Sequence, residues 1–149
     1  MDIRIRKATI NDLAQLANLF NLYRIFYEKQ SAQDAATEFL SERITRHESE
    51  ILVAETGDND LAGFTQLYPL FSSTRMQRLW LLNDLYVSEQ YRGKGISKKL
   101  IEAAKNIAID TNAAGLLLET AKTNAVGNKL YPSTGFKLEQ KSNFYFWEK

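Results

Sequence analysis

An apolar segment, a basic turn with two glycines, an amphipathic segment and a second apolar segment follow one another over residues 79–120. Residues 79–87 are apolar almost throughout, which is typical of a strand buried on both faces. Residues 95–110 repeat apolar side chains at helical spacing, and residues 116–120 again have the pattern of a buried strand. A strand, a helix and a second strand in this order predict a crossover unit whose two strands lie parallel in one sheet.

The segments on either side of this unit predict further strands and helices. Thr9 and Asp12 have the spacing of a helix cap, and Pro132 and Gly135 mark the end of a short helix. The expected elements are a strand at 3–6, helices at 9–28 and 31–46, strands at 51–55 and 61–70 around a turn at 57–60, a helix at 126–131, and a closing hairpin at 136–140 and 143–147.

These elements give the order β-α-α-β-β-β-α-β-α-β-β. A hairpin that precedes a strand–helix–strand unit predicts an α+β fold with a central, twisted, mixed sheet. The chain has 149 residues, enough for one domain over 1–149 that buries a core without disulfide or metal support.

The composition argues against several classes of function. The formal net charge is only +1, which gives no push toward a nucleic acid or a membrane surface. Cysteine is absent, so no thiol nucleophile or thiolate metal ligand exists, and the one histidine, His47, lies in a polar stretch that is typical of a solvated helix end. We expect no metal site. There is no long apolar run and no leader pattern, so a cytoplasmic location is expected.

The stretch QYRGKGIS at residues 90–97 lies where a strand ends and a helix begins. The first N–H groups of a helix have no partner within it, and they bind phosphate where side chains do not block the approach. Gly93 and Gly95 leave that approach open, while Arg92 and Lys94 add positive charge. A flexible basic turn that binds nothing is the alternative.

Gln90, Gly93 and Gly95 fit the pattern Q/R-x-x-G-x-G/A after an apolar strand, and this resembles the acetyl-CoA signature of the GNAT superfamily of N-acetyltransferases. A second signature of that family, an Asn seven residues before a Tyr and then Gly-Phe, is matched by Asn124, Tyr131 and residues 135–136. The order of elements also resembles the family fold, which has helices on both faces of the sheet. Two positions depart from the family pattern, namely Pro132 after the tyrosine and Ser97 in place of a glycine.

The resemblance implies that acetyl-CoA is the co-substrate, with its pyrophosphate on the backbone of the glycine turn. The pantetheine arm would pair with the end of strand 79–87 as an added strand does. The residues that the resemblance assigns to cofactor binding are Leu85, Tyr86, Val87, Arg92, Gly93, Lys94, Gly95, Ile96, Ser97, Asn124 and Tyr131.

Without cysteine, the amine would attack directly in a ternary complex, although an acetyl-serine route stays formally open. Tyr131 matches the family's general acid, since a phenol with an ordinary pKa of about 10 can protonate a leaving thiolate. Asp84 is the candidate base or amine anchor, provided that burial raises its pKa or an ordered water relays the proton. The alternatives are that Tyr131 only packs the short helix and that Asp84 is structural.

The stretch at residues 21–28 resembles the small histone-acetyltransferase-like or diamine–polyamine branch of the family. The resemblance implies an acceptor site made by Tyr23, Tyr27, Glu28, Asp84 and Glu119. Aromatic faces beside carboxylates suit a small cationic amine such as a polyamine, an amino acid or another amino compound. A protein or peptide acetyltransferase and a non-catalytic acyl-CoA sensor are the alternatives. The family also often forms homodimers, which makes a homodimer the expected assembly.

Overall fold

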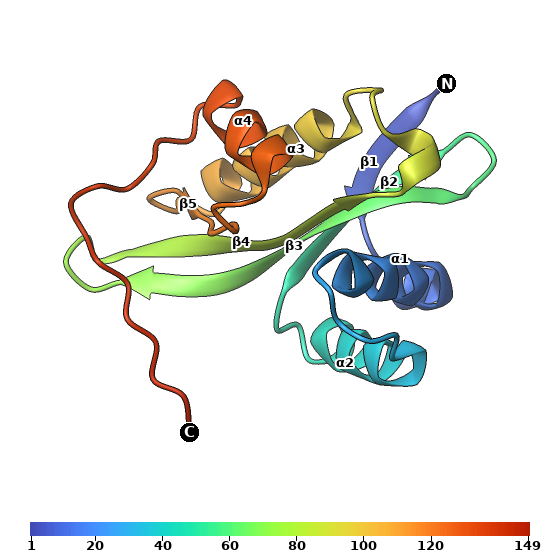
Figure 1. The fold of residues 1–149 in the computed structure, drawn as a ribbon, viewed down its shortest axis with the longest axis horizontal. Helices are drawn as coiled ribbons and strands as arrows, with labels where there is room; N and C mark the ends of the chain where they lie inside the picture. The colour runs from blue at the N-terminus through green and yellow to red at the C-terminus, as the bar shows by residue number, and fades with distance from the viewer. The chain divides into compact units, whose positions relative to one another are not determined.

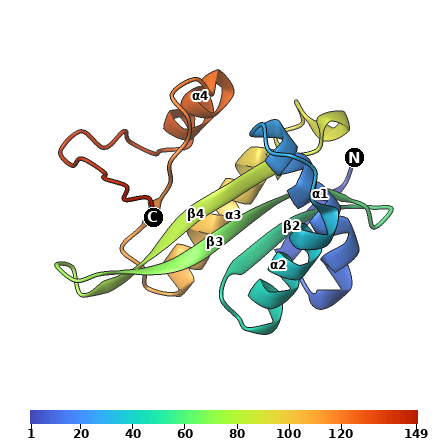
Figure 2. The same cartoon turned by 60° about the horizontal axis from the view of Figure 1, so that its bottom comes forward.

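A five-stranded sheet with the strand order β1-β2-β3-β4-β5 organises the first part of the chain (Figures 1 and 2). The computed structural model describes residues 1–149, which divide into a unit over residues 1–118 and a unit over residues 119–149. The first unit contains β1 (Ile3–Lys7), the short helix η1 (Ile10–Asp12), α1 (Leu13–Phe26), α2 (Gln33–Thr45), β2 (Glu50–Thr56), β3 (Leu61–Ser72), β4 (Gln77–Val87), η2 (Glu89–Tyr91), α3 (Ile96–Asp110) and β5 (Leu116–Leu117). The second contains α4 (Ala125–Ser133).

The sheet is mixed, as the sequence predicts. β1 to β4 pair in antiparallel fashion, whereas β4 and β5 pair in parallel through Trp80 with Leu116 and Leu81 with Leu117. The predicted parallel pair is therefore confirmed. The strand expected over residues 116–120 is shorter than predicted, because only two of its residues pair with β4.

The predicted closing hairpin is wrong. Residues 136–149 contain no strand, and the aromatic run from Phe144 to Trp147 is 79–92% exposed. The run has the composition of a strand, but a strand is stable only where its N–H and C=O groups pair with a neighbour. The expected order of elements thus ends after α4.

Helices cover both faces of the sheet in the first unit, as expected. Figure 1 shows α1 and α2 on one face and α3 on the other. Leu16 and Leu40 pack with Phe64 on the first face, and all three are fully buried. Leu100, Ile101 and Ala104 on α3 are fully buried. None of the helices is both long enough and apolar enough to cross a bilayer.

The cap predicted at the start of the first helix is confirmed. The Thr9 N–H donates to Asp12 Oδ2 at 2.7 Å. Arg6 binds the same carboxylate at 2.8 Å and reaches Glu55 on β2 at 2.6 Å. These bonds to Arg6 lower the pKa of both carboxyls, so both stay charged at neutral pH. The network fastens the start of α1, the helix that carries the candidate acceptor residues, to β1 and β2.

One extra residue interrupts the pairing of β3 with β4. Gln66 pairs with Asp84 and Leu67 pairs with Leu82, so Asn83 has no partner on β3 and forms a β-bulge. Neighbouring residues of a strand point to opposite faces. Leu82 therefore lies on the face of Leu67, and Asp84 lies on the opposite face with Gln66.

Contacts on the two faces agree with this assignment. Before the bulge, Trp80 Nε1 donates to Thr111 Oγ1, directly after α3, at 2.9 Å. After the bulge, the rings of Tyr86 and Tyr23 on α1 lie 6.3 Å apart. The expectation that this strand is buried on both faces holds only in part, since Trp80, Leu82 and Asp84 are its buried side chains. The bulge thus directs the apolar side chains toward α3 and the carboxylate toward α1.

We predict that Gly63→Ala destabilises the protein by about 1–3 kcal/mol, the usual cost of overpacking. A Cβ at Gly63 would lie 2.6 Å from the Tyr86 carbonyl oxygen and 3.2 Å from Val87 Cα, so β3 and β4 would have to separate. Urea unfolding followed by tryptophan fluorescence measures the change. Gly57→Ala is the matched control, because no atom lies within 4 Å of its Cβ position. Equal stability of the two variants would contradict the prediction.

Candidate active site

The turn between β4 and α3 presents bare backbone. Gly93 and Gly95 have φ angles of 75° and 74°, a region that glycine adopts without strain. The first helical hydrogen bond runs from Lys99 N to Gly95 O at 3.2 Å, so the N–H groups of residues 96–98 precede it and have no partner within the helix. No atom lies within 4 Å of the Cβ positions of the two glycines. The predicted anion site therefore has the required open backbone.

The two cations of the turn are both exposed. The Nε of Arg92 donates to the Val87 carbonyl at 3.0 Å, and its guanidinium lies 5.5 Å from the centre of the Tyr86 ring. Arg92 thus fastens the turn to the end of β4 while its outer face stays open to solvent. Lys94 lies 5.5 Å from the Tyr91 ring. The positive charge that the sequence places here is available to an anionic ligand.

The end of β4 has one free edge within this unit. Leu85, Tyr86 and Val87 pair with β3 on one side and are half-buried. On the other side, β5 pairs only with Trp80 and Leu81. The backbone of residues 85–87 is therefore not paired with β5, and an extended ligand with amide groups can add to it. Ile96 contributes only its backbone, since its side chain is 2% exposed and lies in the core.

Asp84 is a buried carboxylate held by three donors. Its side chain accepts from Gln66 Nε2 at 2.8 Å, from Asn83 Nδ2 at 3.1 Å and from the Tyr23 hydroxyl. The residue is only 4% exposed. Burial raises the pKa of Asp84 above the ordinary carboxyl value, and the three hydrogen bonds limit the rise because they favour the charged form. Such a carboxyl is a stronger proton acceptor than an exposed one.

Residues that the sequence did not single out complete this environment. Ser49 Oγ donates to Gln66 Oε1 at 2.8 Å, which leaves the Gln66 amide nitrogen to face Asp84. Gln66 is fully buried. Burial, with the nearby Asp84 charge, raises the pKa of Tyr68 to about 12, so its phenol stays protonated. The sequence did offer one signal for this environment, namely a glutamine in the middle of a mostly apolar strand. A buried glutamine side chain requires hydrogen-bond partners.

The aromatic residues at the end of α1 face this carboxylate. The Tyr23 hydroxyl, which has a single proton to donate, also lies 3.3 Å from the Asn83 carbonyl oxygen as an alternative acceptor. The Tyr23 and Tyr27 rings meet edge-on with centroids 5.0 Å apart. The structure thus brings together Tyr23, Tyr27 and Asp84 among the predicted acceptor residues. Glu28 lies just past the helix, exposed and with a φ of 62°, and its side chain takes no part in this network.

The second unit, residues 119–149, holds the other signature. Asn124 caps α4, since its Oδ1 accepts from Gly127 N at 3.1 Å and its Nδ2 donates to Thr120 at 2.9 Å. A Cβ at Gly127 would lie 2.6 Å from the Asn124 side chain, which explains the glycine. Asn124 therefore has a structural role in addition to any contact with a ligand. Glu119, the weaker acceptor candidate, also belongs to this unit.

Gly135 and Phe136 fix the orientation of Tyr131 within this unit. Gly135 has a φ of 95° and ends the helix, with Gly135 N donating to Pro132 O and Phe136 N to Tyr131 O, both at 3.1 Å. This is the Schellman arrangement of a helix end. The Phe136 ring then packs edge-on against Tyr131 at 5.9 Å. Pro132 lies inside α4 and does not interrupt it.

Comparison with known proteins gives a consistent result. The acetyltransferase (GNAT) family matches residues 15–136. The N-acetyltransferase YhfO of Bacillus subtilis, described as uncharacterized, is 43% identical over 91% of this chain and 90% of its own. A probable acetyltransferase of Haemophilus influenzae is 29% identical over 96% of both chains. A crystal structure of a probable acetyltransferase, 39% identical, superposes with a TM-score of 0.94 over 98% of this chain and 97% of that one.

Proposed function

This chain belongs to the acetyltransferase (GNAT) family and is an acetyl-CoA-dependent N-acetyltransferase, and from that premise we propose that it acetylates the primary amine of a small molecule by direct attack. The observation that carries the proposal is the buried, hydrogen-bonded Asp84 on the strand whose end leads into the glycine turn. A sensor that only binds the cofactor has no need of a buried carboxylate with a raised pKa beside an aromatic wall.

We propose that acetyl-CoA is held by the first unit through backbone groups. The N–H groups of residues 96–98 and the charges of Arg92 and Lys94 would bind the pyrophosphate. The free edge of residues 85–87 would pair with the amides of the pantetheine arm. Asn124 is proposed to contact the cofactor from the second unit. This arrangement needs no metal, because the groups that bind phosphate are N–H donors and cations.

Acetyl transfer requires a neutral amine, and Asp84 is proposed to accept its proton. An aliphatic ammonium has a pKa of about 10.4, so the transfer is uphill for an ordinary carboxylate and less so for one whose pKa is raised. Asp84 is only 4% exposed, and we propose that the Tyr23 hydroxyl bonded to it relays the proton. We propose Tyr131 as the acid that protonates the leaving thiolate.

The acceptor is proposed to be a small cationic amine, in the range from polyamines to amino acids. Tyr23 and Tyr27 present aromatic faces, and Asp84 supplies negative charge behind them. Glu28 and Glu119 are secondary candidates for the carboxylate that attracts the cationic amine. Assignment to the diamine–polyamine branch and a cytoplasmic location stay predictions from the sequence. We also propose that both units form one catalytic domain over residues 1–149, because the family match crosses their boundary.

A thiol-release assay with acetyl-CoA and a panel of amines, amino acids and peptides tests the function. The proposal predicts turnover with small amines and little with peptides. Turnover with peptides alone would favour a protein acetyltransferase. Tight cofactor binding without turnover on any acceptor would favour the sensor and contradict the proposal.

We predict that Asp84→Asn lowers kcat/KM at least about 100-fold, the usual contribution of a general base. The pKa of Asp84 is raised in the folded protein, so its charge disfavours folding above that pKa, and the asparagine variant should have an unchanged or higher free energy of unfolding at pH 7. Wild-type activity should rise with pH as Asp84 loses its proton, and the variant should lack this limb. Asp58→Asn, in the exposed turn after β2, is the control. Full activity of Asp84→Asn would make the residue structural.

We predict that Tyr131→Phe lowers kcat at least about tenfold with little change in cofactor affinity, because only the hydroxyl is removed. The ring contact with Phe136 does not need the hydroxyl, so the fold of the second unit should be kept. Steady-state kinetics and isothermal titration with coenzyme A measure the two effects. Unchanged turnover would assign Tyr131 to packing alone.

We propose a homodimer, because residues 144–147 are four consecutive aromatics that are 79–92% exposed. An exposed apolar run of this kind is typical of an interaction surface. Sedimentation velocity should show a dimer for the full chain and a monomer after removal of residues 141–149. A monomeric full chain at tens of micromolar would contradict the proposal.

A further inference from the structure

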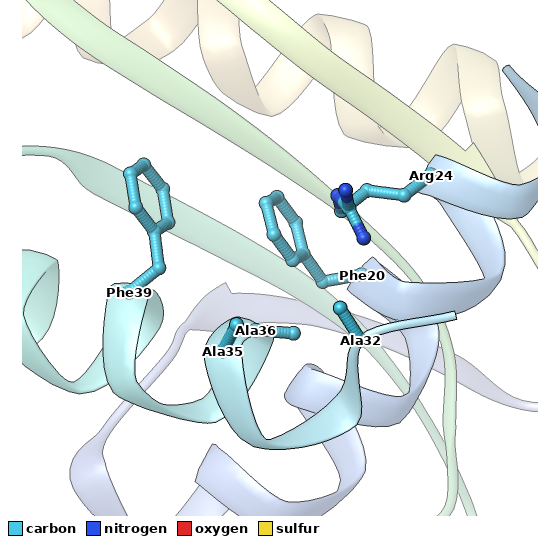
Figure 3. Close-up of a pocket in the computed structure, with 6 residues that line it drawn as sticks. All are labelled: Phe20, Arg24, Ala32, Ala35, Ala36 and Phe39. Atoms are coloured by element: carbon cyan, nitrogen blue, oxygen red, sulfur yellow. The ribbon is translucent and has the colours of Figure 1, made fainter. Parts of the chain in front are cut away.

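A pocket of about 270 Å³ lies between α1 and α2. Phe20 and Arg24 from α1, Ala32 before α2, and Ala35, Ala36 and Phe39 from α2 line it (Figure 3). The rings of Phe20 and Phe39 are stacked, with centroids 5.7 Å apart and an angle of 7° between their planes. The volume is just below the roughly 300–1,000 Å³ of common ligand pockets, which suits a small molecule with an apolar part.

Arg24 is the one charged residue of this lining. Its side chain extends from α1 toward the Phe20 ring (Figure 3). It donates one hydrogen bond, from Nη1 to the Gln30 carbonyl at 2.9 Å, and has no carboxylate partner. Arg6 and Arg43, which are also half-buried, each bind two carboxylates. Burying a cation is costly unless it is paired, and guanidinium groups bind carboxylates strongly, so a ligand carboxylate would supply the missing partner.

Two aromatic side chains, Phe20 and Tyr23, connect the pocket to the candidate base. The Phe20 ring, which forms a wall of the pocket, contacts the Tyr23 ring with centroids 6.2 Å apart. The Tyr23 hydroxyl in turn bonds to Asp84, with the Asn83 carbonyl oxygen 3.3 Å away as the alternative acceptor. This chain of contacts places Tyr23 as the group through which an amine bound beside the pocket would interact with the carboxylate.

We propose that this pocket binds the apolar part of an amino-acid acceptor, with the acceptor's carboxylate on Arg24 and its amine directed toward Tyr23 and Asp84. The inference rests on the acetyl transfer proposed above and narrows its substrate class. A polyamine would bring a second positive charge to Arg24 and find no counter-ion there. An amino acid satisfies both the cation in the pocket and the carboxylate beyond it.

Arg24 also has a structural role, because its bond to Gln30 holds the connection between α1 and α2. Loss of this bond would affect all acceptors alike. The test must therefore compare acceptors that differ only in their carboxylate. The suitable pairs are leucine with leucinamide, phenylalanine with phenylalaninamide, and 6-aminohexanoate with its amide.

The experiment measures kcat/KM by thiol release for each pair with the wild type, Arg24→Gln, Arg24→Lys and the control Arg46→Gln, at an exposed position outside the pocket. For at least one pair, Arg24→Gln should lower the acid-to-amide ratio of kcat/KM at least about tenfold, as loss of a charged hydrogen bond does. Arg24→Lys should lower the acid-to-amide ratio less than Arg24→Gln does, and Arg46→Gln should leave the ratio at its wild-type value. Comparing ratios cancels the different basicity of acid and amide amines.

A second variant tests the pocket without changing charge. Ala35 lines the pocket but is exposed, so Ala35→Phe fills the space without entering the core. Ala35→Phe should raise KM for leucine and phenylalanine about fivefold or more while Tm stays within a few degrees.

Two results would overturn the pocket assignment while acetyl transfer to other amines continued. One is an acid-to-amide ratio of kcat/KM that Arg24→Gln does not change, and the other is an unchanged KM in Ala35→Phe. Absence of transfer to any amine would instead overturn the proposed function itself.

Discussion

The β-bulge at Asn83 is the constraint on which the candidate site depends. Without the extra residue, Leu82 and Asp84 would share a face of the sheet, because they are two positions apart on one strand. With it, Leu82 lies on the α3 face with Trp80, and Asp84 lies on the α1 face, where Gln66 on β3 and Tyr23 on α1 donate to it. A buried carboxylate is tolerated only where such donors are present. The register of β3 with β4 therefore places the Asp84 carboxylate beside the donors that it needs to be charged in this part of the core.

Two kinds of recognition follow from the same strand. At its end, the chain offers backbone groups, namely the free edge of residues 85–87 and the N–H groups of residues 96–98. Before that end, it offers side chains, with Asp84 fixed by Gln66 and, through Gln66, by Ser49. Backbone donors suit a large cofactor with phosphate and amide groups. Fixed side chains suit the proton transfer and the choice of acceptor.

Much of the fold could be predicted from the sequence, because its signals are local. The crossover unit over residues 79–120 follows from periodicity, and the open backbone of the glycine turn follows from residue type. Asp84 and Tyr23 were also identified, through the family resemblance. The closing hairpin was wrong because aromatic composition favours a strand, whereas a strand also needs a partner that no local signal provides.

The remaining parts of the site depend on contacts between distant residues. The bulge at Asn83 is a property of the pairing with β3. Ser49, directly before β2, reaches Gln66 on the neighbouring β3, 17 positions along the chain. The pocket beside Arg24 exists only because α1 and α2 pack with small residues between them. The spacing of apolar residues along the sequence does not reveal contacts between distant residues. A glutamine inside an apolar strand was the one visible sign.

The central claim is that burial on the α1 face gives Asp84 a raised pKa while it stays hydrogen-bonded. Carbon-13 NMR of the protein labelled at the aspartate carboxyls measures it directly, with the spectrum of Asp84→Asn identifying the Asp84 signal. The account predicts a titration midpoint clearly above the ordinary carboxyl value of about 4. A midpoint at or below that value would show that Asp84 is an ordinary charged residue and would contradict its role as the base.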